Sequence, residues 1–496
     1  MTQPSAPHDS AARTRYGFFI TSCLLFAYIL IMTVGIGPHM LSDADPLWHI
    51  AAGDLIRATR SIPLYDTWSF TTHDYRWLDI SWAWDSVFSY LHERLGWHGA
   101  IAANAAIFSL TATLIYVNSR LRSHDDFAAL ISTVAALTLI SIALRPLQVT
   151  YAMTALWMLL LGIIARGQLR CRWLAVLPMT MLPWVNCHGG FVVGGVLIAG
   201  FFLQALYDRN FPLARTLVIT GTVTLAAMFC NPYGIGIIEA VRRPLLTHAN
   251  QFIDEWQPVT LSPVSLLHYI YAACFILLVP RRILPCLPVE RWLAYLWLLL
   301  GITSIRHLPI FTVISAPLMA STLHQLMTWR KPSAPSAFGQ RVGSSHAVAA
   351  SAFTLCLFCL LWLPGPTAGR LYQQEHPTPA QWDMSGELDF IRQHYPGTRF
   401  FSSFNLGSVI AYQTRGKIPI FIDPRTETAF PPAVINDYIS ILNATPGWED
   451  IFDRYDMDGA ILSNEDDREL ISRLSGRKGW KQVFTGTVAT IFARTP

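Results

Sequence analysis

Long apolar stretches alternate with short polar connections over the first two thirds of the chain, and this pattern ends near residue 364. An α-helix needs about 20 apolar residues to cross the hydrocarbon core of a bilayer. Eleven stretches approach this length, and we expect the shorter ones to extend into their flanks. They are residues 16–36, 100–117, 127–144, 149–165, 173–185, 191–207, 214–229, 264–279, 292–305, 309–327 and 347–363. The pattern predicts a polytopic α-helical membrane protein with about 11 transmembrane helices over residues 16–364.

The pattern changes after the last apolar stretch. Helical periodicity appears at residues 387–394, 432–442 and 448–455, and short β-type runs appear at 399–404, 418–422 and 459–462. Residues 481–484 and 488–492 form a plausible hairpin. Residues 365–496 are therefore expected to form a soluble α/β domain, large enough to bury a core of its own.

Arginine and lysine distribution predicts the orientation in the membrane. The basic groups of alternate connections are Arg13 and Arg15, Arg120 and Arg122, Arg166, Arg170 and Arg172, Arg209 and Arg215, Arg281 and Arg282, and Arg330, Lys331 and Arg341. Because positive charge is retained in the cytoplasm, residues 1–15 and the Ser/Pro/Gly-rich linker 329–346 are placed there. The loop 40–98 and the C-terminal domain are then outside.

Composition agrees with this arrangement. Hydrophobic residues make up 52% of the chain and charged residues only 14%, whereas soluble domains carry about 25% charged residues. The net charge of +4 comes without a dense Lys/Arg run, so nucleic acid is not expected as a partner. The eight cysteines lie in or beside apolar stretches and lack the spacing of a metal site.

The loop 40–98 is long and rich in polar and aromatic side chains, and long ordered loops are usually functional. It begins with Asp43 and Asp45 at the point where the first span leaves the membrane. Two such carboxylates could hold a divalent cation, or one could accept a proton while the other orients it. The alternative is that they only cap the helix expected at residues 47–57.

Other polar groups recur at the outward ends of the spans. Arg145 and Arg306 lie where the positive-inside bias makes arginine exceptional, and an arginine fork matches two phosphate oxygens. An internal ion pair with Asp43, Asp45, Asp254 or Glu255 on the same face explains them equally well. His49 could shuttle a proton or bind phosphate, or simply pack. His188 precedes two glycines, which either permit close backbone approach or merely end a helix.

These residues fall in motifs that resemble a bacterial family of the GT-C glycosyltransferase superfamily. The motifs are Asp43-x-Asp45 with Trp48-His49, Pro63-x-x-Asp66-x-Trp68, Leu144-Arg145-Pro146, Asn186-x-His188-Gly189-Gly190, Asn231-Pro232-Tyr233-Gly234, Glu255-Trp256-Gln257-Pro258, Arg306-His307-Leu308-Pro309 and Phe421-Ile422-Asp423-x-Arg425. Members of the superfamily include protein mannosyltransferases, oligosaccharyltransferases and aminoarabinose transferases, which use a lipid-phosphate-linked sugar. The resemblance covers nearly the whole chain.

The resemblance implies an inner-membrane enzyme with its C-terminal domain in the periplasm. It would move a sugar from a polyprenyl-phosphate-linked donor to an extracytoplasmic glycan or glycolipid, with inversion. Asp43 would be the general base and Asp45 a second acid. No cofactor is firmly implied, although Asp43 and Asp45 could hold Mg²⁺ or Mn²⁺. The residues expected to contact substrate or phosphate are His49, Asp66, Arg145, His188, Glu255, Arg306 and His307.

Three alternatives stay open at this stage. A ligase or polymerase of related fold, joining preassembled glycans, has the same sequence features. A transporter of lipid-linked saccharides would carry charges in mid-span, and few are present. A non-catalytic scaffold would have its carboxylates pointing apart.

Overall fold

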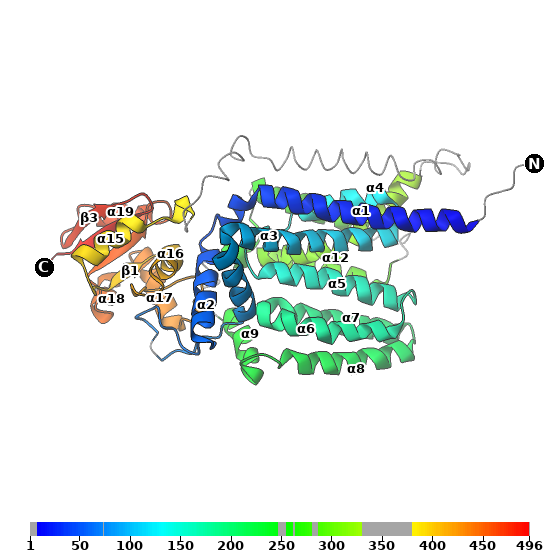
Figure 1. Ribbon diagram of the computed structural model, residues 1–496, viewed down its shortest axis with the longest axis horizontal. Helices are drawn as coiled ribbons and strands as arrows, with labels where there is room; N and C mark the ends of the chain where they lie inside the picture. The colour runs from blue at the N-terminus through cyan, green and yellow to red at the C-terminus, as the bar shows by residue number, and fades with distance from the viewer. Residues whose placement is uncertain are drawn as a thin grey trace, which may run out of the picture.

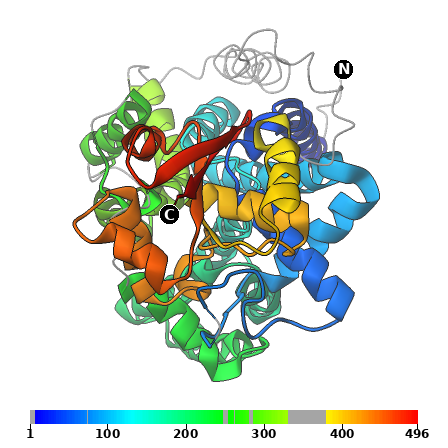
Figure 2. The same cartoon turned by 90° about the vertical axis from the view of Figure 1, so that its left-hand side faces the viewer.

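The computed structural model describes residues 7–72, 74–246, 254–260, 263–279, 286–329 and 379–495. A bundle of long, roughly parallel helices forms one end of the molecule, and an α/β domain forms the other (Figure 1). The short helix α2 (Asp45–Thr59) lies between them, across the ends of the bundle helices. Seen from the domain end, the α/β domain lies over the end of the bundle (Figure 2).

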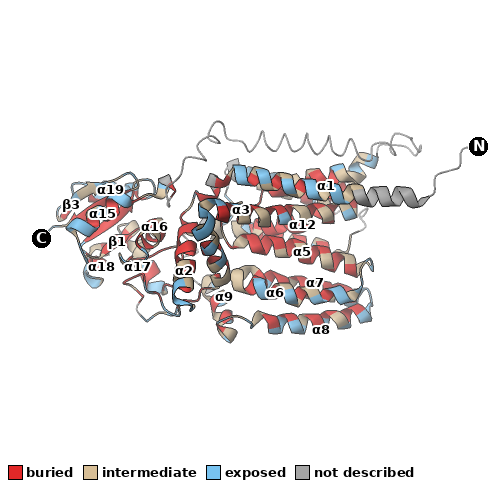
Figure 3. Cartoon of the chain, in the orientation of Figure 1, coloured by how far each residue is buried: buried red, intermediate tan, exposed pale blue. Residues whose placement is uncertain are grey.

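The bundle contains ten of the described helices. They are α1 (Pro7–Gly35), α3 (Trp82–Ser123), α4 (Asp126–Leu137), α5 (Leu147–Ala165), α6 (Val176–Cys187), α7 (Val192–Tyr207), α8 (Phe211–Met228), α10 (Pro263–Leu278), α11 (Pro288–Thr303) and α12 (Leu308–Trp329). Ten of the eleven predicted spans overlap these helices, and the eleventh, 347–363, lies outside the described residues. The helices pack on an apolar core, while apolar side chains on the outer faces of α1 and α8 are exposed, as lipid contact requires (Figure 3).

Not every predicted span is a full-length crossing helix. Among the described residues, six helices are long and apolar enough to cross a membrane, and the apolar helices at residues 126–137 and 266–278 are shorter. The predicted span 127–144 is wrong at its end, because α4 stops at Leu137. The amide nitrogens of Asn104 and Gln148 donate to carbonyl groups of residues 141–143, so this backbone is satisfied without helix. The non-helical stretch leads directly to Arg145.

Glycine shapes two points of the helical framework. Gly96 has φ +63° and breaks α3, so the first part of α3 runs along α2 while the second part enters the bundle. At Gly53 on α2, an added Cβ would lie 2.1 Å from the carbonyl oxygen of Asp85 on α3. The close contact of α2 with α3 therefore depends on glycine at position 53, which has no side chain.

Gly53→Ala is expected to separate α2 from α3 and to destabilise the protein by about 1–3 kcal/mol, as overpacking does. Gly195→Ala is the matched control, because nothing lies within 4 Å of the Cβ position at this glycine of α7. Thermal unfolding of the detergent-solubilised protein measures both. Equal melting temperatures for the two variants would contradict the packing of α2 on α3.

The C-terminal domain contains a four-stranded sheet. The strands are β1 (Phe400–Ser402), β2 (Gly459–Ser463), β3 (Trp480–Thr485) and β4 (Ala489–Arg494), in the order β1-β2-β4-β3. Strands β1 and β2 are parallel and the other pairs antiparallel, which confirms the predicted hairpin. The domain's helices are α15 (Ser385–His394), α16 (Phe404–Thr414), α17 (Pro432–Leu442), α18 (Trp448–Arg454) and α19 (Arg468–Leu474).

The predicted strand 418–422 does not join this sheet. It pairs instead with the long loop after α1: Ile420 N donates to Trp68 O over 2.9 Å, and Phe70 N donates to Ile420 O over 3.2 Å. Sequence pattern identified the extended backbone correctly but not its partner, because the partner lies some 350 residues earlier in the chain. The loop and the domain therefore share backbone hydrogen bonds and one apolar core.

Candidate active site

Because successive helices of the bundle run in opposite directions, six polar turns lie at the same end of it. Asp43 follows α1, Arg145 lies between α4 and α5, and His188 lies between α6 and α7. The turns η6 (Asp254–Trp256) and η7 (Ile305–His307) precede α10 and α12, and the turn 231–234 follows α8. The opposite end carries an ion-pair cluster in which Arg122 and Arg166 both bind the buried Glu290.

Arg145 binds three carboxylates at once. Its Nη2 lies 3.0 Å from Asp43 Oδ2, and its Nε lies 3.0 Å from Asp45 Oδ2, although the Nε–H is not aligned for a hydrogen bond. Its Nη1 donates to Glu255 Oε1. This arrangement matches the ion-pair interpretation of Arg145, and it uses all three sides of the guanidinium.

Local backbone structure fixes these groups in place. Asp45 N donates to Asp43 Oδ1 over 3.0 Å, which holds the two carboxylates in one turn at the start of α2. Glu255 O accepts from Ser304 Oγ over 3.0 Å, so η6 is tied to η7. Proline at position 146 opens α5 directly after Arg145.

Burial and charge act in opposite directions on Asp45. Burial raises the pKa of this carboxyl group, Arg145 lowers it, and Asp43 raises it again, giving a pKa of about 6. Arg145 keeps its proton, because the surrounding carboxylates raise its pKa despite burial. A carboxyl group with a pKa near neutrality is better suited to accept a proton than an ordinary aspartate.

Two neutral histidines lie beside this cluster. His49 is on α2, and its Nδ1 lies 2.6 Å from Asp85 Oδ1; burial lowers its pKa to about 4. His188 Nδ1 lies 2.8 Å from Thr150 Oγ1 and accepts from Gly190 N over 3.1 Å. Burial, with the charge of Arg306, lowers the pKa of His188 to about 3.

The Gly190 contact fixes the tautomer of His188. Because Gly190 N donates to His188 Nδ1, this nitrogen carries no proton, and the Thr150 hydroxyl, which accepts from Trp184 Nε1, donates to it. Nε2 of His188 then carries the ring proton and can act as a hydrogen-bond donor. Gly190 allows this approach, because a Cβ there would lie 2.3 Å from Thr150 Oγ1.

Arg306 and His307 lie in η7, next to Glu255. Arg306 stacks on Trp256, with its Cζ 3.9 Å from the ring centroid. His307 lies against Trp297, with the ring centroids 5.5 Å apart. Arg306 thus lies in the turn next to Glu255 and stacks on the ring of Trp256.

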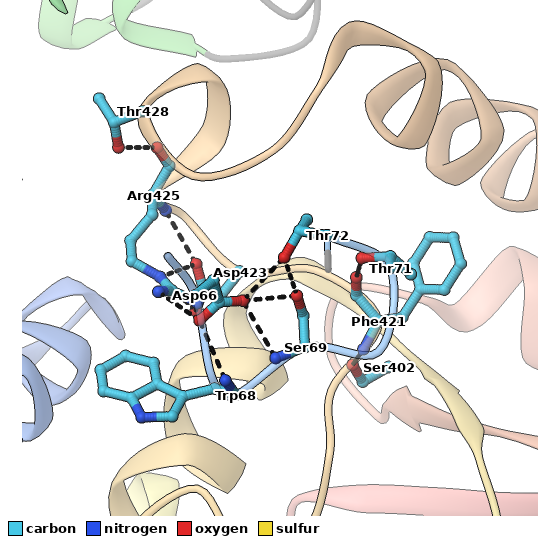
Figure 4. Close-up of polar contacts among 10 residues, drawn as sticks. All are labelled: Asp66, Trp68, Ser69, Thr71, Thr72, Ser402, Phe421, Asp423, Arg425 and Thr428. Atoms are coloured by element: carbon cyan, nitrogen blue, oxygen red, sulfur yellow. Dashed lines mark hydrogen bonds and ion pairs between the residues drawn. The ribbon is translucent and has the colours of Figure 1, made fainter. Parts of the chain in front are cut away.

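Asp66 does not join this cluster. It lies at the joint between the loop and the α/β domain, where Arg425 Nη1 is 2.8 Å from Asp66 Oδ1 and Arg425 Nη2 is 2.8 Å from Asp423 Oδ2 (Figure 4). All three side chains are fully buried. The rings of Trp68 and Trp77 lie 4.4 and 4.5 Å from the Arg425 guanidinium carbon.

This buried group follows the physical rules for charges in an apolar interior. Burial alone would raise the pKa of Asp66, but Arg425 and hydrogen bonds from Ser69 and Trp68 hold it below its ordinary value. Burial raises the pKa of Asp423 despite Arg425. Asp66 and Asp423 thus compensate the charge of Arg425, and Asp66 helps to hold the loop against the α/β domain.

Binding of a divalent cation by Asp43 and Asp45 stays a prediction. With Arg145 held against Asp43 and Asp45, a guanidinium already fills the space between the carboxylates. No group of three or more His, Cys, Asp or Glu side chains in the described part of the chain has an arrangement that could hold a metal ion. The cluster as it stands does not fit Mg²⁺ or Mn²⁺.

Sequence reasoning missed the groups behind the site. Asp79 and Asp85 both lie within the loop 40–98, but nothing in their spacing connects them to His49. Thr150 looked like an ordinary residue of an apolar span, and Glu290 like an isolated acid. An acid or hydroxyl inside an apolar stretch is a usable signal, since such groups are costly unless paired.

No known family profile matches the sequence, and no curated protein matches it. Solved structures do resemble the fold. The oligosaccharyltransferase of Archaeoglobus fulgidus, tethered with an acceptor peptide, has a TM-score of 0.52 at 12% identity over 95% of this chain and 74% of its own. The oligosaccharyltransferase AglB from Archaeoglobus fulgidus, in complex with an inhibitory peptide and a dolichol-phosphate, has a TM-score of 0.56 at 11% identity over 88% of this chain and 69% of its own.

Another solved structure matches over nearly its full length. ArnT from Cupriavidus metallidurans, bound to undecaprenyl phosphate, has a TM-score of 0.50 at 14% identity over 95% of this chain and 97% of its own. At such low identity the likeness shows the fold. Together with the apolar helices, it establishes that this chain is a polytopic membrane protein with the fold of the GT-C glycosyltransferases.

Proposed function

We propose that this protein transfers a sugar from a polyprenyl-phosphate-linked donor to an extracytoplasmic glycan or glycolipid. The observation that carries the proposal is the cluster of Arg145 with Asp43, Asp45 and Glu255, with Arg306 beside it, at one end of a GT-C bundle. Transfer from a phosphate-linked donor needs a base for the acceptor and positive charge for the leaving phosphate. Both kinds of group lie together here.

An apolar groove supports a lipid-linked donor. A cavity of about 300 Å³ lies between α4, α10 and α12, and its apolar lining includes Leu139, Leu267, Leu278 and Leu326. Each of these three helices is connected at one end to a turn that carries a site residue. A polyprenyl tail could lie in this apolar groove. Two structures of the same fold hold dolichol-phosphate and undecaprenyl phosphate.

The reaction would be a single inverting displacement. The acceptor oxygen attacks the anomeric carbon as its proton passes to a carboxylate of the Asp43–Asp45 pair. The bond from that carbon to the phosphate oxygen breaks, and the phosphate leaves with the bonding electrons. Sequence resemblance points to Asp43 as the base, but the raised pKa of Asp45 favours Asp45 for this role. Arg306 would stabilise the charge that develops on the phosphate.

The site and the α/β domain would lie on the periplasmic side of a bacterial inner membrane. Both are at the same end of the bundle, so they share one side. The opposite end carries Arg122, Arg166, Arg170 and Arg172, as the cytoplasmic side of a membrane protein does. Nucleotide sugars are absent from the periplasm, which is a further reason to expect a lipid-linked donor.

The transfer rate is expected to depend on pH through Asp45. Its pKa of about 6 means that the carboxylate form predominates above that pH and is lost below it. The rate should fall about tenfold per pH unit on the acid side and level off above about pH 7. Initial rates in proteoliposomes measure this, with melting temperatures at each pH as a control for unfolding. A rate that is flat across the range would contradict the role of Asp45.

The proposal is tested by the lipid and glycan profile of a strain that lacks the gene. Mass spectrometry of its lipid extract is expected to show accumulated polyprenyl-phosphate sugar and an acceptor one sugar short. The wild-type gene should restore both, and a gene encoding Asp45→Asn should restore neither. An unchanged profile in the deletion strain, with the wild-type strain as reference, would overturn the proposal.

A further inference from the structure

The short segment 40–45, which we call the acidic turn, leads into α2 and carries two of the site carboxylates. Its first carbonyl group, Met40 O, accepts a hydrogen bond from Leu144 N over 3.3 Å. Leu144 immediately precedes Arg145 in the chain. A backbone hydrogen bond therefore ties the acidic turn to the segment that supplies its arginine partner.

The next carbonyl group of the acidic turn is held by the α/β domain. Leu41 O accepts from Gln381 Nε2 over 2.6 Å and from Trp382 Nε1 over 3.0 Å. Leu41 is 5% exposed, and these two donors use both lone pairs of its carbonyl oxygen. Both donors belong to η9 (Ala380–Trp382) at the start of the domain, so the domain holds the backbone two residues before Asp43.

A glutamine of α16 fixes η9 in turn. Gln413 Nε2 donates to Trp382 O over 2.8 Å, and Gln413 Oε1 accepts from Met384 N over 3.3 Å. One side-chain amide thus binds the backbone at the end of η9 and again two residues later. The two donors to Leu41 are therefore held at a defined place relative to α16.

Helix α16 also packs on α2, the helix that begins at Asp45 (Figure 1). Leu47 and Ala51 of α2 share one apolar core with Val409 and Ile410 of α16. The site carboxylates therefore lie between two points of attachment to the α/β domain. One point is the carbonyl group held by η9, and the other is the apolar face of α2.

We propose that Gln381 and Trp382 are positioning residues, which hold the acidic turn in its working place against Arg145. This inference rests on the proposed function and gives the α/β domain a part in it. Both donors are engaged by the Leu41 carbonyl group, so their effect on the reaction passes through the backbone of the acidic turn. A displacement of about 1 Å at a reacting group can slow an enzyme about 100-fold, which sets the scale of the expected effect.

A role confined to stability predicts a different result. If the two donors only attach the domain, their loss lowers the melting temperature and leaves the turnover of the folded protein unchanged. If they position the acidic turn, kcat falls with little change in KM, because the substrates still bind to the rest of the site.

Hydrogen exchange gives a second readout, which needs no substrate. Asp45 N donates to Asp43 Oδ1 over 3.0 Å, and Leu47 N donates to Ala44 O over 3.1 Å. These two hydrogen bonds lie in or beside the acidic turn, so loosening of the turn is expected to expose both amide groups to exchange.

The experiment measures transfer by the full-length double variant Gln381→Met, Trp382→Phe in proteoliposomes. This variant removes both donors and keeps most of the side-chain volume. We expect kcat to fall about 10–100-fold with KM changed less than about threefold. Hydrogen exchange of residues 40–48 should become faster, while that of strands β1–β4 stays as in the wild-type protein. Gln381→Lys in the Trp382→Phe background restores one donor and should recover part of kcat.

The double variant Trp480→Phe, Gln482→Met is the matched control, on β3 of the same domain. It removes an indole donor to Glu449 Oε1 at 3.3 Å and an amide donor to Thr485 Oγ1 at 2.6 Å, neither of which lies in the acidic turn. It should leave both kcat and the exchange of residues 40–48 unchanged.

A kcat of the variant at positions 381 and 382 within about threefold of the control's would overturn the positioning role, and so would unchanged exchange of residues 40–48. If that variant loses the fold of the domain, seen as faster exchange throughout β1–β4, Trp382→Phe alone decides by the same two measurements. If the wild-type protein shows no transfer at all, the proposed function fails, while the exchange of residues 40–48 still tests whether η9 holds the acidic turn.

Discussion

Asp45→Asn is expected to lower the rate of sugar transfer about 10³-fold while the protein stays folded. The side chain keeps its size and one oxygen, but it can no longer accept a proton. Arg145 retains Asp43 and Glu255 as partners, so its charge remains compensated. Rates in proteoliposomes, under single-turnover conditions, report the chemical step directly.

Asp43→Asn distinguishes the two carboxylates. If Asp45 is the base, the asparagine at position 43 should slow transfer less, because it removes only a positioning group. If Asp43→Asn is the more damaging change, the base is Asp43, as the sequence resemblance implied. Transfer by both variants within about threefold of the wild-type rate would remove the pair from the mechanism.

Arg425→Met is expected to destabilise the joint between the loop and the α/β domain by about 3–5 kcal/mol, because Asp66 and Asp423 would be left buried without a positive partner. Arg454→Met is the matched control. Arg454 binds Asp437 over 2.9 Å but is 59% exposed, so its loss should cost less than about 1 kcal/mol. Thermal unfolding of the solubilised full-length protein compares the two.

A compensating variant separates charge from packing at the same place. Replacing Asp66 and Asp423 with asparagine in the Arg425→Met background removes the uncompensated charges and should recover part of the lost stability. Hydrogen exchange of residues 66–78 and 418–430 reports whether the joint itself has opened. Equal stability of Arg425→Met and Arg454→Met would contradict the account of the joint.

Periodicity predicted most of the fold, because spans and amphipathic helices depend on local pattern. The helix over residues 432–442 has the predicted bounds. The two strands of the hairpin begin and end within a few residues of their own predicted bounds. The failures lie where distant side chains decide the backbone. Residues 138–144 are apolar enough for helix, but Asn104 and Gln148 satisfy their carbonyl groups instead.

The candidate site was predictable as a set of residues but not as a geometry. Turns at one end of the spans could be read from the sequence, and they bring Asp43, Asp45, Arg145 and Glu255 together. The sequence left an ion pair and a phosphate site equally open for Arg145, and only the folded structure shows its three carboxylate partners. The position of Asp66 at the domain joint depends on Arg425, which no local pattern links to it.

The most direct test of the account is transfer by the purified full-length protein in liposomes. The donor would be polyprenyl-phosphate sugar extracted from the deletion strain, and the readout would be release of polyprenyl phosphate with the sugar appearing on the acceptor. We expect release by the wild-type protein and about 10³-fold slower release by Asp45→Asn. No release by the wild-type protein, or equal release by the variant, would contradict the assignment of a glycosyltransferase site to this cluster.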